Sequence, residues 1–499
     1  MREYSKLPRL LINIFCCVFA VVFSVAVVGA VISRFDCWPV AVILVALTAV
    51  GLLLLVLFYR LLTRKKEFVE RYYKFIISAM LAALFCVQII FGLMLRYQPI
   101  FDLNAVYGGA LHWVQTGSFA DYTDPYCHDN YFYIFPNNLG TLSLFYVLFK
   151  AATAVGITDY FAVATVANSL VIIGSVYMTT LICKRKFGAV GGVFAGAIFL
   201  ISPPFWFMAA VFYTDTLSMI IPVAVYYLCI CANKHDSAAR RMPYYLASAV
   251  LSGVGALIKP TVLIVSIAVA VAYALQRNWR SLLAFAATSA VIISAVMCAF
   301  NGYIYSAHLD KTTADKMNMP YEYWLSLGLS GNGQYNNEYF ALAVTEPDPD
   351  VRVQKLRDVI SDNLSEQGVA GVTVLFCNKL GYLFGDGTLA LSDHLDDYPT
   401  NPNPLHDWIL YSGNRYTEYS TVTTALFLAV LILMLIAVPV GRGRVNVLVP
   451  FISVFGLTLF LLFWEVNVRY ITNFVPMIYV CAVCGAHKLS SLKLKQRKR

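Results

Sequence analysis

Residues 38–61 read WPVAVILVALTAVGLLLLVLFYRL, and Arg60 is the one charged residue in the run. A helix needs roughly 20 apolar residues to cross the hydrocarbon core of a bilayer, and this run is long enough. Trp38 stands at its start, where aromatic side chains favour the boundary between lipid and water. The stretch therefore predicts a membrane-spanning helix.

Similar apolar runs recur along the whole chain. Of the 499 residues, 59% are hydrophobic and only 13% are charged, whereas about a quarter of the residues of soluble domains carry a charge. In water such a chain could not cover its apolar surface, but in lipid it need not do so. The sequence therefore predicts an all-α polytopic integral membrane protein. The further runs cover residues 10–32, 75–95, 139–156, 160–183, 187–207, 213–231, 244–258, 261–275, 281–300, 421–440, 445–464 and 470–487.

The net charge of +9 is concentrated in short connectors between these runs and in the C-terminal tail. Basic connectors mark the cytoplasmic side of a membrane protein, so we expect no nucleic-acid partner and both termini in the cytoplasm. Two cytoplasmic termini require an even number of spans. If 139–156, which carries Lys150, does not cross, all the basic connectors become cytoplasmic. The prediction is a bundle of about 12 spans plus one re-entrant or in-plane helix. The connectors contain Arg60, Arg64, Lys65, Lys66, Arg71 and Lys74, Lys184 to Lys186, Arg240 and Arg241, and Arg442 and Arg444.

This topology predicts the division of the chain into parts. Within the external parts, apolar residues recur at helical spacing from Leu103 to Val114, which predicts an amphipathic helix. Asp348-Pro349 predicts the start of another helix and Gly368 its end. The parts are residues 1–74 with two leading spans and a basic connector, 75–300 as a membrane core with a first external loop at 96–138, 301–420 as a mixed external loop module, 421–487 with the last spans, and 488–499 as a basic cytoplasmic tail.

Asp102 follows the run 75–95 almost directly and stands at the predicted membrane surface. A carboxylate in that place can act as a general base on a hydroxyl acceptor. Asp102 also immediately precedes the amphipathic helix, and Asp is a favoured N-cap. Both interpretations stay open, and the two roles are compatible.

The segment from residue 121 to 138 is dense in aromatic, carboxylate and amide groups. Aromatic faces stack on sugar rings and polar groups pair with hydroxyls, so Tyr131 and Asn137 are candidates for substrate binding. Asp124, His128 and Asp129 are candidate ligands of a divalent cation. An ordinary solvated loop explains the same composition about as well.

Three charged residues stand at external ends of spans: Asp215, Lys259 and Arg469. An ionisable group at the edge of an apolar run is costly to bury and is a candidate for function. Lys259 and Arg469 could hold phosphate oxygens. The simpler alternatives are a helix cap at Asp215, a Lys259 side chain that reaches to water, and a local pair between Arg469 and Glu465.

The order and sidedness of these motifs resemble the GT-C superfamily of polytopic membrane glycosyltransferases, which includes protein mannosyltransferases and the aminoarabinose transferase of lipid A. The resemblance covers most of the chain from Phe75 on. It rests on short motifs, namely the Asp102 loop, residues 131–136, Thr214-Asp215, residues 253–260 and Arg469-Tyr470. In one departure, several relatives have paired prolines where this chain has Phe135-Pro136-Asn137-Asn138.

The resemblance implies a donor sugar carried on a polyprenyl phosphate or pyrophosphate, in a bacterial plasma membrane. It implies that Asp102 is the base, that Asp215 is a supporting acid, and that Lys259 and Arg469 contact the donor phosphate. The acceptor would be a glycan, a lipid or a protein on the external face.

Two other functions compete with this one. A lipid-linked saccharide flippase or exporter would show inverted repeats and charges near the middle of the membrane; here charges collect at external ends. An O-antigen-type polymerase or ligase would use an arginine or histidine of the large external loop in place of a carboxylate.

Overall fold

The computed structural model describes residues 6–496 apart from 126, 396–398 and 439–444. In these ranges the chain is built from helices; the described residues contain no β-strand, only an isolated bridge between Tyr97 and Pro399. Nine helical segments of the described chain are long and apolar enough to cross a membrane. The predicted all-α polytopic fold class is confirmed.

The nine candidate spans leave much of their apolar surface exposed, as lipid contact requires: Leu53, Leu54 and Leu283 are each more than half exposed. The candidates are α1 (Lys6–Ile32), α2 (Trp38–Arg64), α3 (Lys66–Met94), α7 (Tyr160–Ile201), α9 (Thr214–Leu217) with α10 (Ile220–Ala232), α13 (Trp279–Ala307), α17 (Pro349–Gly385), α20 (Tyr416–Ala437), and η6 (Val468–Phe474) with α22 (Val475–Gln496). Shorter apolar helices are α12 (Leu263–Leu275) and α21 (Val445–Phe463), and α11 (Ala238–Ile258) packs beside α10 and α13.

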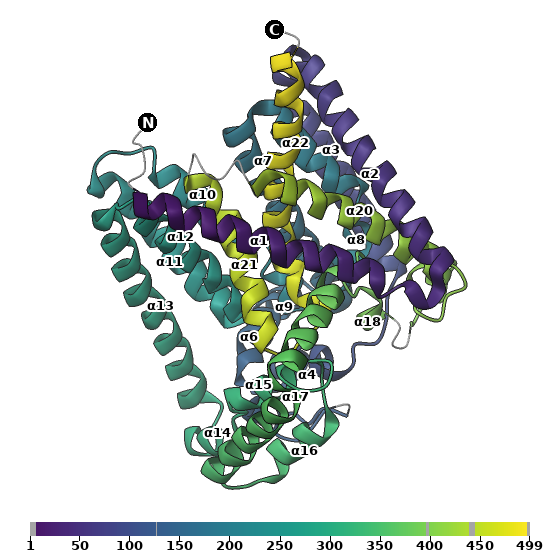
Figure 1. Ribbon diagram of the computed structural model, residues 1–499. Coiled ribbons are helices and arrows are strands. Elements are labelled where there is room, and N and C mark those ends of the chain that lie inside the picture. Colours follow the sequence, from purple (N-terminus) through teal and green to yellow (C-terminus); the bar gives the residue numbers. More distant parts are fainter. Residues whose placement is uncertain (1–5, 126, 396–398, 439–444, 497–499) are drawn as a thin grey trace.

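Figure 1 shows how these helices are arranged. Helices α11, α12 and α13 form the left side, and α2, α3, α20 and α22 the upper right. The lower end is made by α4 (Phe101–Thr116), α14 (Lys311–Met317), α15 (Tyr321–Gly328), α16 (Asn337–Thr345) and the first part of α17. Helix α1 runs across the front of the bundle, and the N-terminal end of α1 and the C-terminal end of α22 both lie at the upper end.

Local sequence signals place several helix ends. Asp348 caps α17 by accepting hydrogen bonds from the backbone N–H of Asp350 and Val351, and Gly368 interrupts the helix with a φ of 57°. The predicted start and end of that helix are thereby confirmed. Lys259 is extended and separates α11 from η4 (Pro260–Val262), because the proline ring cannot continue the preceding helix. Gly188, with a φ of 76°, likewise breaks α7 into two helices.

Helix α6 (Leu139–Ala154) is the segment for which the sequence predicts no crossing. Its 16 residues span about 24 Å, less than the roughly 30 Å of the hydrocarbon core. It is not among the nine candidate spans of the described chain and packs chiefly against α4. The amphipathic helix predicted for residues 103–114 is this α4, which ends at Gly117 with a φ of 88°.

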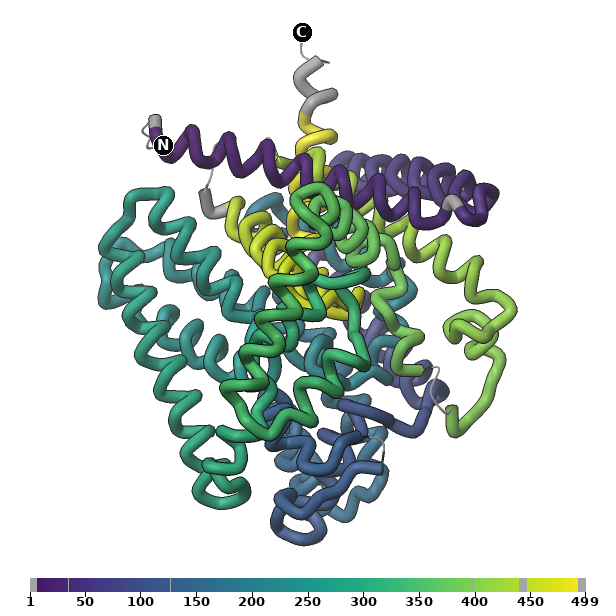
Figure 2. Tube along the Cα trace, turned by 60° about the horizontal axis from the view of Figure 1, so that its bottom comes forward, coloured from purple at the N-terminus to yellow at the C-terminus, as the bar shows by residue number. Residues whose placement is uncertain are grey.

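The second half of α17 lies against α1 in Figures 1 and 2. The two helices meet at glycines: a methyl group added at Gly29 would lie 2.9 Å from the Cα atom of Gly381. Gly385, one turn later, faces Ala30, and a methyl group added at Gly385 would lie 3.3 Å from the Cα atom of Ala30. Small residues four apart let helices approach closely in lipid. Residues 369–385 therefore form a membrane-like segment that the sequence analysis did not separate from the external module 301–420.

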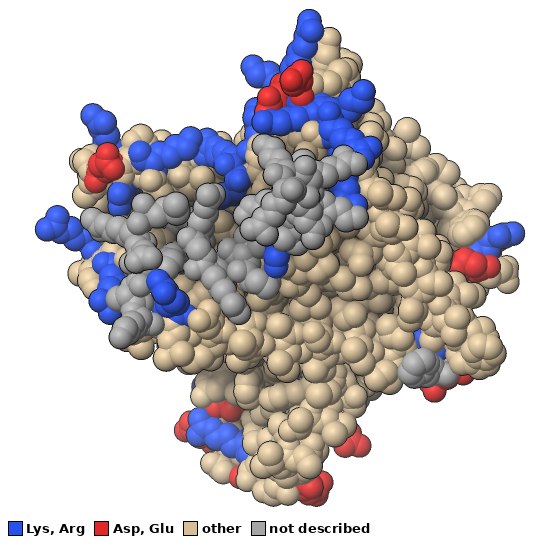
Figure 3. All heavy atoms as spheres, turned by 45° about the horizontal axis from the view of Figure 1, so that its top comes forward, with Lys and Arg blue, Asp and Glu red and all other residues tan. Residues whose placement is uncertain are grey.

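The basic connectors of the described chain lie at one end of the molecule. In Figure 3 Lys and Arg side chains gather over the upper end, and the broad middle of the visible face carries almost none. Lys184 Nζ lies 3.9 Å from the ring centre of Tyr73, and Arg185 Nη1 lies 2.7 Å from Cys231 Sγ, so separate connectors touch. The connector with Arg442 and Arg444 lies outside the described residues.

This gathering generates a prediction for topology. Reporters fused after Lys186 and Arg241 should read cytoplasmic, and reporters after Asp102 and Asp350 should read external, because basic connectors are retained in the cytoplasm. Alkaline phosphatase and green fluorescent protein fusions measure the two sides independently. An external signal after Lys186 would reverse the choice of α6 as the segment that does not cross.

Candidate functional site

Asp102 belongs to a chain of hydrogen bonds at the N-terminal end of α4. The Tyr131 hydroxyl donates to Asp102 Oδ1 at 2.7 Å, and Asn138 Nδ2 donates to the Tyr131 oxygen at 2.5 Å. Tyr213 donates in turn to Asn138 Oδ1 at 3.4 Å. Tyr131, Asn138 and Tyr213 are buried, whereas Asp102 is half-buried and so keeps access to the surface.

Asp102 does not cap its helix. The N-cap position of α4 is Ile100, and no side chain there bonds to the helix. Asp102 lies in the first turn, where the helix dipole favours a carboxylate. The preceding Phe101 is 61% exposed and has a φ of 48°, a backbone conformation that bulky residues rarely adopt. Such strain is often found at functional sites.

Asp215 and Lys259 form a buried ion pair between the start of α9 and the break after α11. Their side chains are 6% and 11% exposed, so Lys259 does not reach out to water. Asp215 does not cap α9 either, since the N-cap residue is Tyr213 and makes no side-chain bond. The Lys259 ammonium also lies 4.8 Å from the ring centre of Tyr470.

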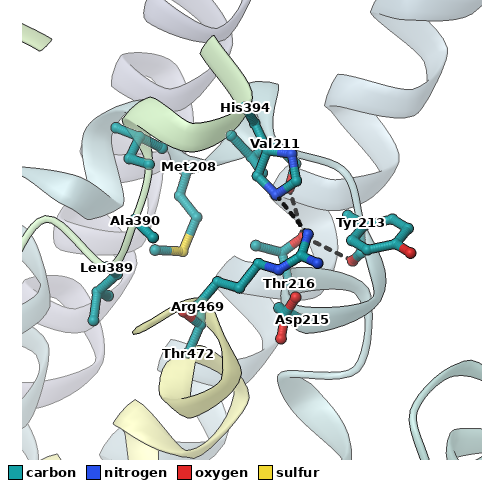
Figure 4. A pocket seen from close by; sticks show the side chains of 11 residues that line it. Met208, Val211, Tyr213, Asp215, Thr216, Leu389, Ala390, His394, Arg469 and Thr472 are labelled. Atoms are coloured by element: carbon teal, nitrogen blue, oxygen red, sulfur yellow. Dashed lines mark hydrogen bonds between the residues drawn. The ribbon is translucent and has the colours of Figure 1, made fainter. Parts of the chain in front are cut away.

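Arg469 extends into a pocket from η6 (Figure 4). Its guanidinium carbon lies 5.2 Å from the ring centre of Tyr213 and 5.4 Å from that of Tyr470, and Nη1 donates to His394 Nε2 at 3.3 Å. Arg469 Nε is buried and has no hydrogen-bond partner in the described structure. Glu465 accepts from the Tyr470 hydroxyl at 3.2 Å, and the ion pairs among the described residues do not include Glu465 with Arg469.

The pocket is a tight hollow with a largely apolar lining and a few polar side chains. The space that the centres of water molecules can occupy is about 20 Å³, little more than one water molecule needs. Besides Arg469 it is lined by Thr472, whose hydroxyl is buried and likewise has no partner in the described structure. Two donors without partners in one hollow are suited to an anion. The lining side chains are Met208, Val211, Tyr213, Asp215, Thr216, Leu389, Ala390, Leu391, His394, Arg469 and Thr472.

His394 enters the pocket from the large loop and was not singled out in the sequence. It follows a tight turn in which Leu389 and Ala390 have φ values of 59° and 54°. The Asp386 carboxylate holds this turn by accepting from the backbone N–H groups of Thr388 and Ala390 at 2.8 and 3.3 Å. Burial and the charge of Arg469 lower the pKa of His394 from 6.5 to about 3. The imidazole is therefore neutral and can accept the hydrogen bond of Arg469.

Burial also shifts the pKa values of Tyr131 and Glu465, two other groups near the site. Burial and the Asp102 carboxylate raise the pKa of Tyr131 well above its ordinary value, so Tyr131 remains a phenol that can donate to Asp102. Burial also raises the pKa of Glu465 above its ordinary value of 4.5.

The other sequence candidates lie elsewhere. Asn137 is exposed, and its neighbour Asn138 is the amide that joins the network. The Asp124 carboxylate accepts from Asn104 at 2.9 Å and from Tyr122 at 3.2 Å. His128 bonds to the backbone oxygen of Asp129. In the described part of the chain no group of three His, Cys, Asp or Glu side chains is placed to hold a metal ion.

A family model described as "Conserved hypothetical integral membrane protein" matches residues 4–489 of the chain. Among solved structures, the chain is similar to the crystal structure of ArnT from Cupriavidus metallidurans bound to undecaprenyl phosphate, at 11% identity and a TM-score of 0.38, over 83% of this chain and 77% of that chain. No protein of curated function matches the sequence.

The neutral His394 predicts a pH dependence of stability. In the folded chain the imidazole takes up a proton only near pH 3, whereas its ordinary pKa is 6.5. Between these values the unfolded chain binds more protons, so the free energy of unfolding falls as the pH decreases from 6.5 towards 3. Thermal unfolding in detergent should show a larger loss on acidification for the wild type than for His394→Asn. Parallel losses would mean that His394 is not buried in its neutral form.

Proposed function

This chain belongs to the family of conserved hypothetical integral membrane proteins, and we propose that it is a membrane glycosyltransferase. It would transfer a sugar from a polyprenyl-phosphate-linked donor to an acceptor on the external face of the membrane. One observation carries the proposal: a continuous network joins a carboxylate to a cation that has no carboxylate partner in the described structure. Asp102 bonds to Tyr131, Tyr131 to Asn138, Asn138 to Tyr213, and Arg469 lies over the Tyr213 ring.

The contacts of Lys259 and Arg469 support different roles for these two cations in the proposed reaction. The charge of Lys259 is matched by Asp215 inside a buried pair, so it adds little net attraction for an anion. Arg469 instead contacts neutral groups, namely His394 and two tyrosine rings, and its Nε has no partner among the described residues. We therefore assign the donor phosphate to Arg469 and regard Lys259 as the partner that fixes Asp215.

The proposed reaction uses these groups in one displacement. The acceptor hydroxyl attacks the anomeric carbon, its proton passes to the Asp102 carboxylate, and the bond between that carbon and the phosphate oxygen breaks. Polyprenyl phosphate leaves with the electron pair, and the Arg469 guanidinium stabilises the charge that develops on its oxygens. Tyr131 holds the carboxylate in place through the 2.7 Å hydrogen bond. No nucleotide site is needed, because the sugar arrives on a lipid.

One observation favours a second candidate. His394 belongs to the large loop segment and touches Arg469 in the pocket, which is the arrangement expected of an O-antigen-type polymerase or ligase. In that function an arginine or a histidine of the large external loop, rather than Asp102, would be essential. The glycosyltransferase and the polymerase or ligase differ in the residue whose loss stops transfer. Variants of Asp102 and His394 therefore distinguish the two functions.

Asp102→Asn should abolish transfer while leaving membrane insertion near normal, since an amide of the same shape cannot take the proton. Loss of a general base lowers the rate by about 10² to 10⁴. Mass spectrometry of cell-envelope glycans, in a strain lacking the protein and complemented with each variant, measures the transfer. The matched control is Asp121→Asn, an exposed carboxylate of the same loop that pairs with His112, which should keep full activity. Normal glycans with Asp102→Asn and none with His394→Asn would support the polymerase or ligase instead.

Arg469→Lys should be more damaging than conservation of charge suggests, because one ammonium cannot reproduce a planar guanidinium that contacts His394 and phosphate together. Arg469→Ala should weaken binding of undecaprenyl phosphate by about 1.5–3 kcal/mol, the range for hydrogen bonds to charged groups. Native mass spectrometry of the protein in nanodiscs measures the affinity. Arg415→Ala is the control, since Arg415 is exposed and lies over Trp408 away from the pocket. Unchanged affinity in Arg469→Ala would remove the phosphate contact from the proposal.

A further inference from the structure

Lys379 is completely buried in the second half of α17, where the surrounding sequence is apolar. Its ammonium donates to three backbone oxygens, those of Gly328, Leu462 and Trp464, each at 2.8 Å. An ammonium has three hydrogens to donate, so all three are used. A buried charge is costly unless it is fully hydrogen-bonded, and here it is.

The three oxygens belong to the C-terminal ends of two helices. Gly328 is the last residue of α15, and Leu462 and Trp464 lie at the end of α21. The last carbonyls of a helix have no partner inside that helix, and they carry its partial negative charge. Lys379 therefore satisfies the orphan carbonyls of two helices at once and places a positive charge between their negative ends.

The same contact fixes the turn that leads to Arg469. After α21 the backbone N–H of Glu465 donates to Trp324 at 3.1 Å, and that of Val466 donates to Gly333 at 2.7 Å. The rings of Trp324 and Trp464 are stacked with centroids 5.4 Å apart. Residues 464–466 are thus bound to the external module by backbone hydrogen bonds next to the contacts of Lys379. Arg469 lies three residues beyond this segment.

We propose that Lys379 is a positioning residue, which locks the turn 464–469 to the external module and so holds Arg469 in the pocket. The inference rests on the proposed function, in which Arg469 binds the donor phosphate. The proposal also gives the membrane half of α17 a role that no motif of the sequence indicates. This half of the helix contacts the external module, the last external turn and α1, and it thereby holds these three parts in place around the site.

The test is a double-mutant cycle with undecaprenyl phosphate as the probe. Lys379→Met keeps an unbranched side chain one atom shorter than that of lysine and removes the three donors. In the wild-type background it should weaken binding about tenfold, within the range known for coupled neighbours. In the Arg469→Ala background it should change binding by less than about twofold, since the contact it positions is already gone. Equal weakening in both backgrounds would mean that the lysine acts through general stability and would overturn the proposal.

Amide hydrogen exchange gives a readout that does not depend on function. In Lys379→Met the amides of residues 464–469 should exchange faster, and those of α2 and α3 should not; unchanged exchange in the turn would overturn the proposal. Lys379→Gln keeps a donor and should lie between the wild type and Lys379→Met, so it serves if Lys379→Met fails to fold. Lys355→Met, an exposed lysine of the same α17, is the control. Normal lipid binding by Arg469→Ala would overturn the proposed phosphate contact, while exchange still decides whether Lys379 holds the turn.

Discussion

Helix ends inside an apolar environment must find partners for their free backbone groups without water, and the functional end of this molecule is built on that constraint. In lipid or among packed apolar side chains, a backbone carbonyl or N–H group without a hydrogen bond costs several kcal/mol relative to one that is hydrogen-bonded. At the ends of α15 and α21 the partner is Lys379. Between α11 and α12 the chain breaks at Lys259, whose charge is matched by Asp215 at the start of α9. Charged side chains are thus placed where helices stop.

The fold and the outline of the site could be predicted because they depend on local signals. Apolar runs of sufficient length identify spans whatever their neighbours are, and Asp348-Pro349, Lys259-Pro260 and Gly368 act on the backbone next to them. Asp102, Asp215, Lys259 and Arg469 are candidates in the sequence because each stands beside an apolar run. The sequence places them on one side of the membrane, but it predicts neither their contacts nor the ion pair of Asp215 with Lys259.

The rest depends on contacts between distant residues. The first half of α17 is polar, so the membrane character of residues 369–385 is hidden until Gly29 and Gly381 are seen in contact. His394 stands in a loop without a periodic pattern, and only the turn held by Asp386 brings it to Arg469. Asn137 and Asn138 are indistinguishable by composition; the short 3₁₀ helix from Pro136 to Asn138 turns the second one inward. A buried lysine such as Lys379 gives no signal that separates it from a lysine facing water.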